Sequence, residues 1–395
     1  MLLTPELQAQ LLGRPVRAVL TDMDRLVLGG GRVLITGAGG SLGSELARQT
    51  ATCGPERLVL LDHSEYALFQ IESELRMRHP ELEIDAVLGD VSRGVDLRTT
   101  CAAARPHVVY HVAAYKHVTM TERAIVPALR TNVLGTIETA RAARHVGARF
   151  VLVSSDKAAD PSSVMGATKR LAELATMSMA SPGFRPVAVR FGNVLGSSGS
   201  LVEIMARCVA EGRDIPITHP DATRFFMTAG EAVSLVLKAD MMGERAEVFW
   251  LDMGDPIRIG DLAERFIALA TPRGRRKVGV EIIGLRPGEK MNEVLTAKGR
   301  SMRATEHPAI FSARQKPIRQ GELADALKAL RSAVGSGNAA DALEALRAAV
   351  PEFAASEAAL RAARSTQNAA VVSRINGALR IRATRPVLAR DLLFQ

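Results

Sequence analysis

An acidic and a basic side chain stand side by side at Asp156 and Lys157, directly after an apolar run at 149–153. A carboxyl group and an amine held together at the end of a strand can give protons to one bound molecule and take protons from it. A second lysine, Lys169, lies on the stretch expected to form the following helix. The alternative for the pair is a surface ion pair, and for Lys169 a solvated side chain. The spacing after a strand favours proton-transfer chemistry.

A glycine cluster at Gly37, Gly40 and Gly43 lies upstream, between the apolar run 32–36 and a helical pattern from Ser44. Glycines between a strand and a helix let the backbone turn tightly and approach a pyrophosphate, whose charge then meets the helix N-terminus. The spacing GxxGxxG differs from the commonest dinucleotide fingerprint, and a plain tight turn is the alternative. The position between strand and helix favours a nucleotide site.

An aspartate, Asp62, ends the next apolar run about 20 residues further on. A carboxylate there accepts hydrogen bonds from ribose hydroxyls and repels a 2′-phosphate, so the sequence favours NAD over NADP as cofactor. Asp90 and Val91 follow the third run and are candidates for the adenine edge, with an ordinary loop aspartate as the alternative.

The regular spacing of short apolar runs predicts the scaffold that holds these groups. Stretches long enough for helices separate the runs, an alternation typical of a parallel sheet with helices on both faces. The expected strands lie at about 32–36, 57–61, 83–88, 107–112, 149–153 and 186–190. We therefore expect an α/β fold of the Rossmann type, a doubly wound parallel sheet with a smaller C-terminal substrate-binding part.

The remaining segments give the expected domain organisation. Strands are expected within 251–259 and 280–283, and the similar stretches 324–334 and 340–350 predict a helical hairpin. The expected parts are an N-terminal arm at 1–30, a NAD-binding Rossmann domain at 31–195, a substrate-binding part at 196–353 that includes the hairpin, and an Ala- and Arg-rich, partly disordered tail at 354–395.

Composition limits the other classes of function. The chain of 395 residues carries a formal charge of +9, but its Lys and Arg residues are scattered and aromatic residues make up 4%, which disfavours nucleic acid as a partner. No apolar stretch is long enough to cross a membrane and no signal peptide begins the chain, so a cytoplasmic protein is expected. The three Cys residues are far apart and the His residues lack metal-site spacing, so no metal is expected. Three arginines are candidates for binding a diphosphate: Arg190, Arg224 and Arg286.

With these motifs in place, the chain resembles the extended short-chain dehydrogenases/reductases, and among them the polysaccharide-biosynthesis UDP-N-acetylglucosamine 4,6-dehydratases. The resemblance runs from about Leu11 to Phe353. It rests on the segments 36–43, 62–65, 113–118, 131–132, 155–158, 190–196, 223–228 and 284–290.

The resemblance implies a role for each matching residue. It implies catalytic roles for Ser155, Asp156, Lys157, Met165 and Lys169, with Lys169 also orienting the nicotinamide ribose. It places NAD against Gly37, Gly40, Ser41, Leu42, Gly43, Asp62, His63, Asp90, Val91, Ala113, Ala114 and Lys169. It places the UDP-sugar against Lys116, Asn132, Arg190, Asn193, Arg224, Arg286 and Glu289, with Asn132 fixing the backbone near the catalytic strand.

Two departures from the family pattern carry consequences. Met165 replaces the tyrosine of the usual Tyr-x-x-x-Lys motif. A methionine at this position resembles the larger, membrane-anchored branch of these dehydratases. In that branch the hydroxyl residue before Asp-Lys assists in place of the tyrosine, and Ser155 takes that position here. That branch carries an N-terminal transmembrane region, so this chain resembles its catalytic portion alone, expected in the cytoplasm with the inner face of the membrane as an alternative location.

The resemblance also implies a reaction and an assembly state. Hydride leaves C4 of the sugar for NAD, Lys157 removes the C5 proton, Asp156 donates a proton to the departing C6 hydroxyl, and hydride returns to C6. C5 is retained or inverted, and the product feeds a surface polysaccharide or another glycan. A homo-oligomer, dimer or hexamer, is expected. A UDP-sugar 4-epimerase and a non-catalytic NAD-binding scaffold remain the alternatives.

Overall fold

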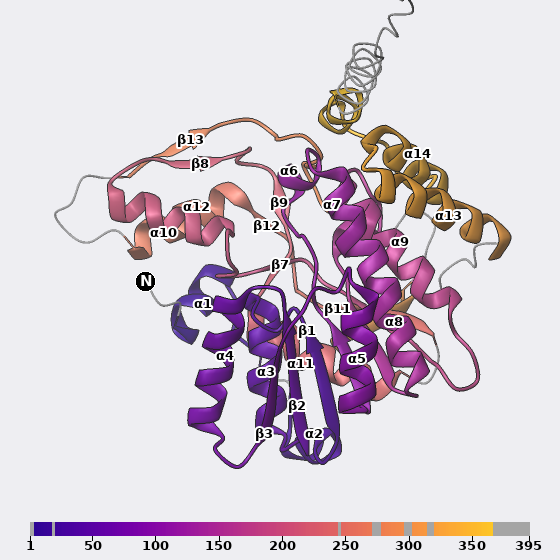
Figure 1. The fold of residues 1–395 in the computed structure, drawn as a ribbon. Coiled ribbons are helices and arrows are strands. Elements are labelled where there is room, and N and C mark those ends of the chain that lie inside the picture. The colour runs from indigo at the N-terminus through magenta and orange to yellow at the C-terminus, as the bar shows by residue number, and fades with distance from the viewer. Residues whose placement is uncertain are drawn as a thin grey trace, which may run out of the picture.

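A nine-stranded sheet forms the centre of the protein in the computed structural model, which describes residues 4–17, 20–243, 246–270, 278–295, 302–313 and 320–365 (Figure 1). The strand order is β14-β15-β11-β6-β5-β4-β1-β2-β3. Seven strands run parallel: β1 (Arg32–Thr36), β2 (Arg57–Asp62), β3 (Glu83–Leu88), β4 (Val108–His111), β5 (Arg149–Val153), β6 (Val187–Arg190) and β11 (Glu247–Leu251). β15 (Ile310–Ala313) and β14 (Arg303–Ala304) complete one edge as antiparallel strands.

The six strands predicted from apolar runs are confirmed. The central strands are buried on both faces, which explains why they are apolar throughout instead of alternating. The chain order reverses between β1 and β4, and at such a point the carboxyl ends of the strands leave room for a ligand.

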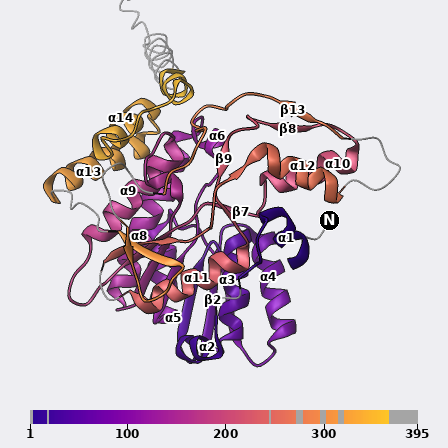
Figure 2. The same ribbon diagram turned by 180° about the vertical axis from the view of Figure 1, so that it is seen from behind.

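Helices cover both faces of the sheet (Figures 1 and 2). One face packs on α3 (Ser41–Thr52), α4 (Glu65–Arg78) and α11 (Ala229–Met242). The other packs on α5 (Gly94–Ala104), α8 (Thr136–His145) and α9 (Val164–Ser178). Short helical segments complete this part: α2 (Asp22–Leu28), α6 (Val118–Thr121), α7 (Ile125–Leu129), the π-helix η1 (Arg130–Gly135) and the 3₁₀-helix η2 (Asp156–Ala158).

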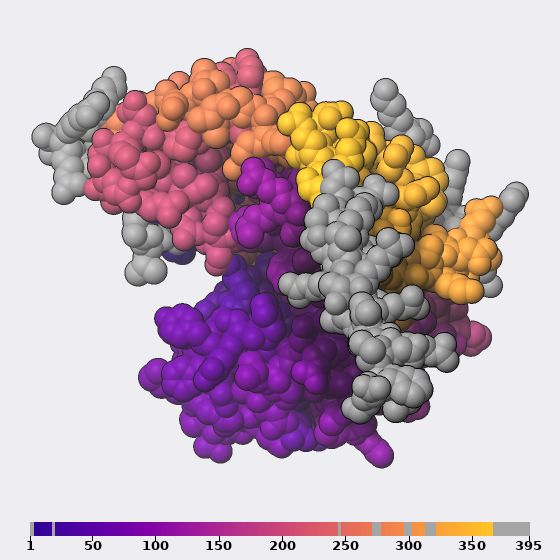
Figure 3. Space-filling view, turned by 45° about the horizontal axis from the view of Figure 1, so that its top comes forward, coloured from indigo at the N-terminus to yellow at the C-terminus, as the bar shows by residue number. Residues whose placement is uncertain are grey.

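A second, smaller part lies beyond the carboxyl ends of the strands and has its own apolar core. Its helices are α1 (Pro5–Leu12), α10 (Leu201–Glu211) and α12 (Ile259–Ala270). Its strand pairs are β8 (Ile215–Ile217) with β13 (Val280–Ile282), β9 (Thr223–Arg224) with β12 (Ile257–Arg258), and β7 (Asn193–Val194) with β10 (Phe226–Met227). The bounds predicted for a strand at 251–259 are therefore wrong. In the structure β11 ends at Leu251, and β12 covers only Ile257–Arg258 of the predicted stretch. Figure 3 shows the surface hollowed where this part meets the sheet domain.

The N-terminal segment is not the irregular arm that the sequence predicted. Thr4 caps α1, and Thr21 with Asp24 forms a capping box at the start of α2. Arg14, just after α1, forms an ion pair with the buried Glu231 at 2.6 Å. The segment is therefore an integral part of the fold.

The predicted helical hairpin is confirmed as α13 (Gln320–Ser336) and α14 (Ala339–Ala349). It packs against α7, η1 and α9 of the sheet domain instead of joining the substrate-binding part. Strands β11, β14 and β15 also return to the main sheet, so the boundary predicted at residue 195 separates the two parts less cleanly than expected. Residues 357–365 of the tail are helical and pack on the same cluster, while 366–395 lie outside the described residues.

The buried position of Leu11 predicts a stability cost for removing it. Leu11 is fully buried in the core of the second part, whereas Leu26 on α2 is 75% exposed. Leu11→Ala should lower the free energy of unfolding by about 2–5 kcal/mol, because it leaves a cavity, and Leu26→Ala should change it by less than about 0.5 kcal/mol. Denaturant unfolding measures both, and equal effects would contradict the packing of α1.

Candidate active site

The candidate acid and base lie on η2, immediately beyond the carboxyl end of β5. Ser155 caps this single turn by accepting a hydrogen bond from the Lys157 amide at 3.2 Å. The Asp156 amide donates to the carbonyl of Phe191 at 2.9 Å, which ties the turn to the segment after β6. The backbone thus fixes the place of both side chains.

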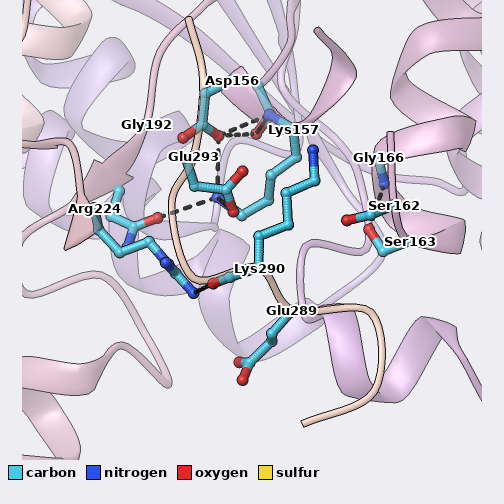
Figure 4. Close-up of polar contacts among 12 residues, drawn as sticks. Asp156, Lys157, Ser162, Ser163, Gly166, Gly192, Arg224, Glu289, Lys290 and Glu293 are labelled. Atoms are coloured by element: carbon cyan, nitrogen blue, oxygen red, sulfur yellow. Dashed lines mark hydrogen bonds and ion pairs between the residues drawn. The ribbon is translucent and has the colours of Figure 1, made fainter. Parts of the chain in front are cut away.

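Three oxygens surround the ammonium group of Lys157 (Figure 4). Its Nζ lies 3.0 Å from Oδ1 of Asp156, 3.4 Å from Oε1 of Glu293 and 3.4 Å from Oδ1 of Asn193. Burial lowers the pKa of Lys157, but the carboxylates of Asp156 and Glu293 outweigh it, and the net effect is a raised pKa. Lys157 is therefore held as an ammonium.

The two carboxyl oxygens of Asp156 differ in their hydrogen bonding. Oδ1 accepts from the Ser155 hydroxyl at 2.8 Å, the Lys157 amide at 2.8 Å and the Lys157 ammonium at 3.0 Å. Oδ2 is buried and has no hydrogen-bond partner among the described residues. A buried oxygen without a partner is costly, so Oδ2 is the atom of this group suited to meet a bound hydroxyl.

Lys169 and Met165 lie on α9, which Ser163 caps by accepting from the Gly166 amide at 3.1 Å. Lys169 is buried and donates to the carbonyl of Val153 at 2.9 Å. Burial lowers the pKa of Lys169 to about 8, although Glu173 acts in the opposite direction. Met165 is 4% exposed, so an apolar side chain fills the position where the family motif has tyrosine.

The glycine cluster forms a tight loop between β1 and α3. Gly37 has φ +71° and contacts the backbone at Ala113 so closely that a Cβ would lie 2.6 Å from the Ala113 nitrogen. A Cβ on Gly43 would lie 1.9 Å from the Gly37 oxygen. Gly40 begins α3 without any side-chain cap, which leaves the first amides of the helix, at Ser41 and beyond, available to an anion.

Asp62 lies beside this loop at the end of β2. It is 6% exposed and accepts from the amides of Gly39 and Ser64, each at 2.9 Å. His63 is exposed and its Nδ1 lies 3.3 Å from Asp62 Oδ1. The structure therefore brings Asp62 to the predicted place, where it also braces the loop.

The other predicted cofactor residues line the neighbouring strand ends. Asp90 follows β3 and accepts from the Ser92 amide at 2.8 Å, whereas Val91 is buried. Ala113 and Ala114 follow β4, with the Ala113 amide bonded to the Thr36 carbonyl. Leu42 lies in the first turn of α3, half-buried. Their contacts with NAD remain a prediction.

Arg190 lies in a buried ion pair, which disfavours the diphosphate contact predicted for it. It is 2% exposed and its guanidinium donates to both carboxylate oxygens of Glu173, at 2.6 Å for Nε and Oε1. The same group lies 4.7 Å above the ring of Trp250. Burial raises the pKa of Glu173, but Arg190 and Arg170 outweigh it and lower the pKa overall, so the pair is a buried structural ion pair.

Arg224 also has a structural role that the sequence did not predict. It is 8% exposed and donates to the carbonyls of Thr223, Met291 and Lys290 at 2.8, 3.0 and 2.7 Å. Its guanidinium thus holds the chain at 290–291 instead of standing free for a diphosphate.

Arg286 and Glu289, predicted to bind the nucleotide, bind each other at 2.6 Å. Arg286 is half-exposed. Burial lowers the pKa of His117, and the positive charges of Lys116 and Arg286 lower it further, so these two cations lie near His117. Burial likewise lowers the pKa of Lys116. Lys116 and Arg286 are therefore the positive groups of the predicted set that remain near the surface.

Asn132 fixes backbone beside the site, as the resemblance implies, but its burial disfavours the substrate contact that was also predicted for it. It is fully buried, and its amide accepts from the Tyr115 nitrogen at 2.8 Å and donates to the Tyr115 oxygen and to Thr168 Oγ1, both at 3.0 Å. No polar atom is left for a sugar. Asn132 instead fixes the loop after β4 from within a π-helix, a local irregularity often found beside functional sites.

Glu293 is the site residue that sequence reasoning missed. It follows the recognised segment 284–290 by three positions, and its side chain is 5% exposed beside Lys157. A lone Glu in a loop carries no periodic signal, and only the fold brings it next to a residue so distant in the chain.

In the part of the chain that the structure describes, no group of three or more His, Cys, Asp or Glu side chains is placed to hold a metal ion. Over the same ranges, no helix combines the length and the apolar character needed to cross a membrane.

The reversed strand order, the glycine loop and the residues after β5 define a Rossmann-type short-chain dehydrogenase/reductase fold. The chain belongs to the family described as "Polysaccharide biosynthesis protein", which matches residues 33–315. It is 42% identical over 270 residues to the capsular polysaccharide biosynthesis protein CapD of Staphylococcus aureus, covering 67% of this chain and 45% of that protein. It is 42% identical over 292 residues to the probable polysaccharide biosynthesis protein EpsC of Bacillus subtilis, covering 73% and 48%. The chain thus spans less than half the length of these two relatives.

More distant relatives and solved structures extend the comparison. A UDP-glucose 4-epimerase of Rickettsia rickettsii is 28% identical over 285 residues, covering 69% of this chain and 80% of that protein. Pen from Bacillus thuringiensis has a TM-score of 0.68 and 30% identity, covering 74% of this chain and 92% of that one. DesIV of Streptomyces venezuelae, a dTDP-glucose 4,6-dehydratase with NAD and TYD bound, has a TM-score of 0.60 and 20% identity, covering 67% and 88%; this likeness shows the fold alone.

The ion pair beneath the site gives a prediction about Arg190. Removing one partner of a buried pair leaves an uncompensated charge, so Arg190→Met should lower the free energy of unfolding by about 3–5 kcal/mol. Adding Glu173→Gln should recover part of that loss, because it removes the carboxylate that has lost Arg190, while Arg170, the other cation beside Glu173 at 3.5 Å, keeps its ion pair with Glu352. Arg286→Met, whose ion pair is exposed, should stay within about 0.5 kcal/mol. If Arg190→Met weakened sugar-nucleotide binding without changing denaturant unfolding, the structural role would be wrong.

Proposed function

We propose that the protein is an NAD-dependent 4,6-dehydratase of UDP-N-acetylglucosamine that forms UDP-2-acetamido-2,6-dideoxy-4-hexulose for polysaccharide or other glycan synthesis. The observation that carries the proposal is the buried Asp156–Lys157 pair at the carboxyl end of β5, in a site where Met165 leaves no phenol. Elimination of water needs an acid for the leaving hydroxyl and a base for the C5 proton, and the pair supplies both kinds of group.

The residues present fit NAD. The loop at Gly37 and Gly43 has no room for a Cβ, and α3 begins without a side-chain cap, as a pyrophosphate-binding turn requires. Asp62 lies where a ribose would reach it, and Lys169 lies at the end of β5 where a nicotinamide ribose would lie. Bound NAD would supply the hydride acceptor, and as NADH the hydride donor, that oxidation at C4 and reduction at C6 require.

The side chains of the site divide the proton chemistry among them. Ser155, which donates to Asp156 Oδ1 at 2.8 Å, is assigned to assist removal of the C4 hydroxyl proton. Transfer of the Lys157 ammonium proton to the Asp156 carboxylate, 3.0 Å away, leaves a neutral amine, which removes the proton on C5 that the 4-ketone makes acidic. Asp156 gives the proton it received to the C6 hydroxyl as that group leaves as water, with Oδ2 as the carboxyl oxygen free to meet it, and the ion pair is restored. Lys116 and Arg286 are assigned to the diphosphate, because Arg190 and Arg224 are occupied elsewhere.

A UDP-sugar 4-epimerase is the second candidate, supported by the Rickettsia relatives that carry that name. Both reactions begin by oxidising C4. An epimerase that relies on a tyrosine would lack it here, since Met165 fills that place. A non-catalytic NAD-binding protein is the third candidate and would bind the cofactor without turnover.

Proton NMR of the protein with UDP-N-acetylglucosamine and NAD in D2O separates these candidates. Dehydration predicts a new C6 methyl signal with deuterium at C5, and the coupling constants then report retention or inversion at C5. Lys157→Met should slow this reaction on the order of 10²–10⁴-fold, because the base is lost, while Lys328→Met, an exposed position on α13, should leave it unchanged. Appearance of the galacto isomer without a methyl signal would mean epimerisation, and an unchanged spectrum with NAD bound would refute the proposal.

A further inference from the structure

Glu293 is buried, and the segment that precedes it is tied to the rest of the protein by several contacts. The preceding segment is held by Arg224, and the Asn292 side chain accepts from the Thr223 hydroxyl at 2.8 Å. The Thr223 amide donates to the Met291 carbonyl at 2.8 Å. Lys290 forms an ion pair with Asp160 at 2.8 Å, close in sequence to η2. These contacts fix the backbone that leads to Glu293.

The Glu293 carboxylate faces one cation. Lys157 Nζ, at 3.4 Å, is its ion-pair partner among the described residues. Burial of a carboxylate is costly unless the carboxylate is paired with a cation. The contact with Lys157 therefore explains why Glu293 can be buried at this position. Figure 4 shows Glu293 reaching the ammonium group from the loop, opposite the η2 turn that carries Asp156.

The charged groups around Lys157 come from three elements. Asp156 on η2 and Glu293 on the loop stabilise the ammonium, whereas Arg224 on β9 opposes it, and Asn193 on β7 adds a neutral acceptor. The ammonium donates hydrogen bonds to Asp156 Oδ1 and Asn193 Oδ1 and forms an ion pair with Glu293, and it has no lone pair with which to accept a proton from carbon. Lys157 must lose one proton before it can act as a base. The neutral amine then has one N–H group fewer to donate to these acceptors.

We propose that Glu293 is a positioning residue, whose carboxylate holds the Lys157 ammonium against Asp156 and controls when that amine is free to accept a proton. The role of Lys157 as a base rests on the proposed function, but the effect of Glu293 on the protonation of Lys157 does not depend on it. Removing the negative charge removes a group that favours the ammonium, so Lys157 becomes neutral at lower pH. The rate limited by the neutral amine then rises at lower pH as well.

The first experiment follows the lysine directly in the free protein. Protein labelled with ¹³C at lysine Cε is titrated by NMR, and Lys157→Arg assigns the Lys157 signal. In Glu293→Gln the Lys157 titration should move to lower pH, in Glu293→Asp it should stay near that of the wild type, and in Glu281→Gln, an exposed position on β13, it should not move. An unmoved Lys157 titration in a folded Glu293→Gln protein overturns the inference, whether or not the protein turns over any sugar.

The second experiment is the pH profile of C5 deuterium incorporation. The ratio of the rate at about pH 6 to that at about pH 9 should rise on the order of tenfold in Glu293→Gln, as expected for loss of one opposite charge within hydrogen-bond reach. A uniform loss of rate at every pH would mean a merely structural role and would overturn the inference. A shifted lysine titration in a protein that forms no methyl signal would refute the proposed function and leave the lysine–glutamate contact standing.

Discussion

The buried ammonium of Lys157 is the interaction on which the rest of the site depends. A charge at the end of a central strand loses most of its hydration, and only acceptors supplied by the protein can replace that water. One acceptor, Asp156, is its neighbour in the chain, but Glu293 belongs to a loop of the second part. The charge of one residue therefore couples the position of the second part to the sheet.

Several structural contacts follow from that requirement. Arg224 donates to the carbonyls of Met291 and Lys290, which holds the loop where Glu293 meets the lysine. Below the site, Arg190 and Glu173 neutralise each other, and the Ser154 hydroxyl also donates to Glu173 at 2.6 Å. In the sequence, Arg190 and Arg224 look like ligand-binding residues. In the structure both are buried and hold together the elements around the site, so burial distinguishes a structural role from a binding role.

The sequence predicted the sheet and the groups at its carboxyl edge, because strands buried on both faces are continuously apolar and their ends carry the polar motifs. It could not predict α1 and α2, which are short and owe their stability to caps and to partners such as Glu231. Nor could it separate Arg190, which is buried and bonded to Glu173, from an arginine that stays near the surface such as Arg286. Glu293 was missed for the same reason, since its partner is a product of the fold and leaves no local pattern.

The most direct test of this account is a double-mutant cycle on the free energy of unfolding, with Lys157→Met, Glu293→Gln and the double variant measured by denaturant unfolding. Coupling of about 1–3 kcal/mol is expected, because Lys157→Met leaves the buried Glu293 carboxylate without its ion-pair partner, whereas Glu293→Gln leaves Lys157 with the Asp156 carboxylate. Additive effects, with the double variant losing the sum of the two single losses, would show that Glu293 and Lys157 do not depend on each other and would contradict the account.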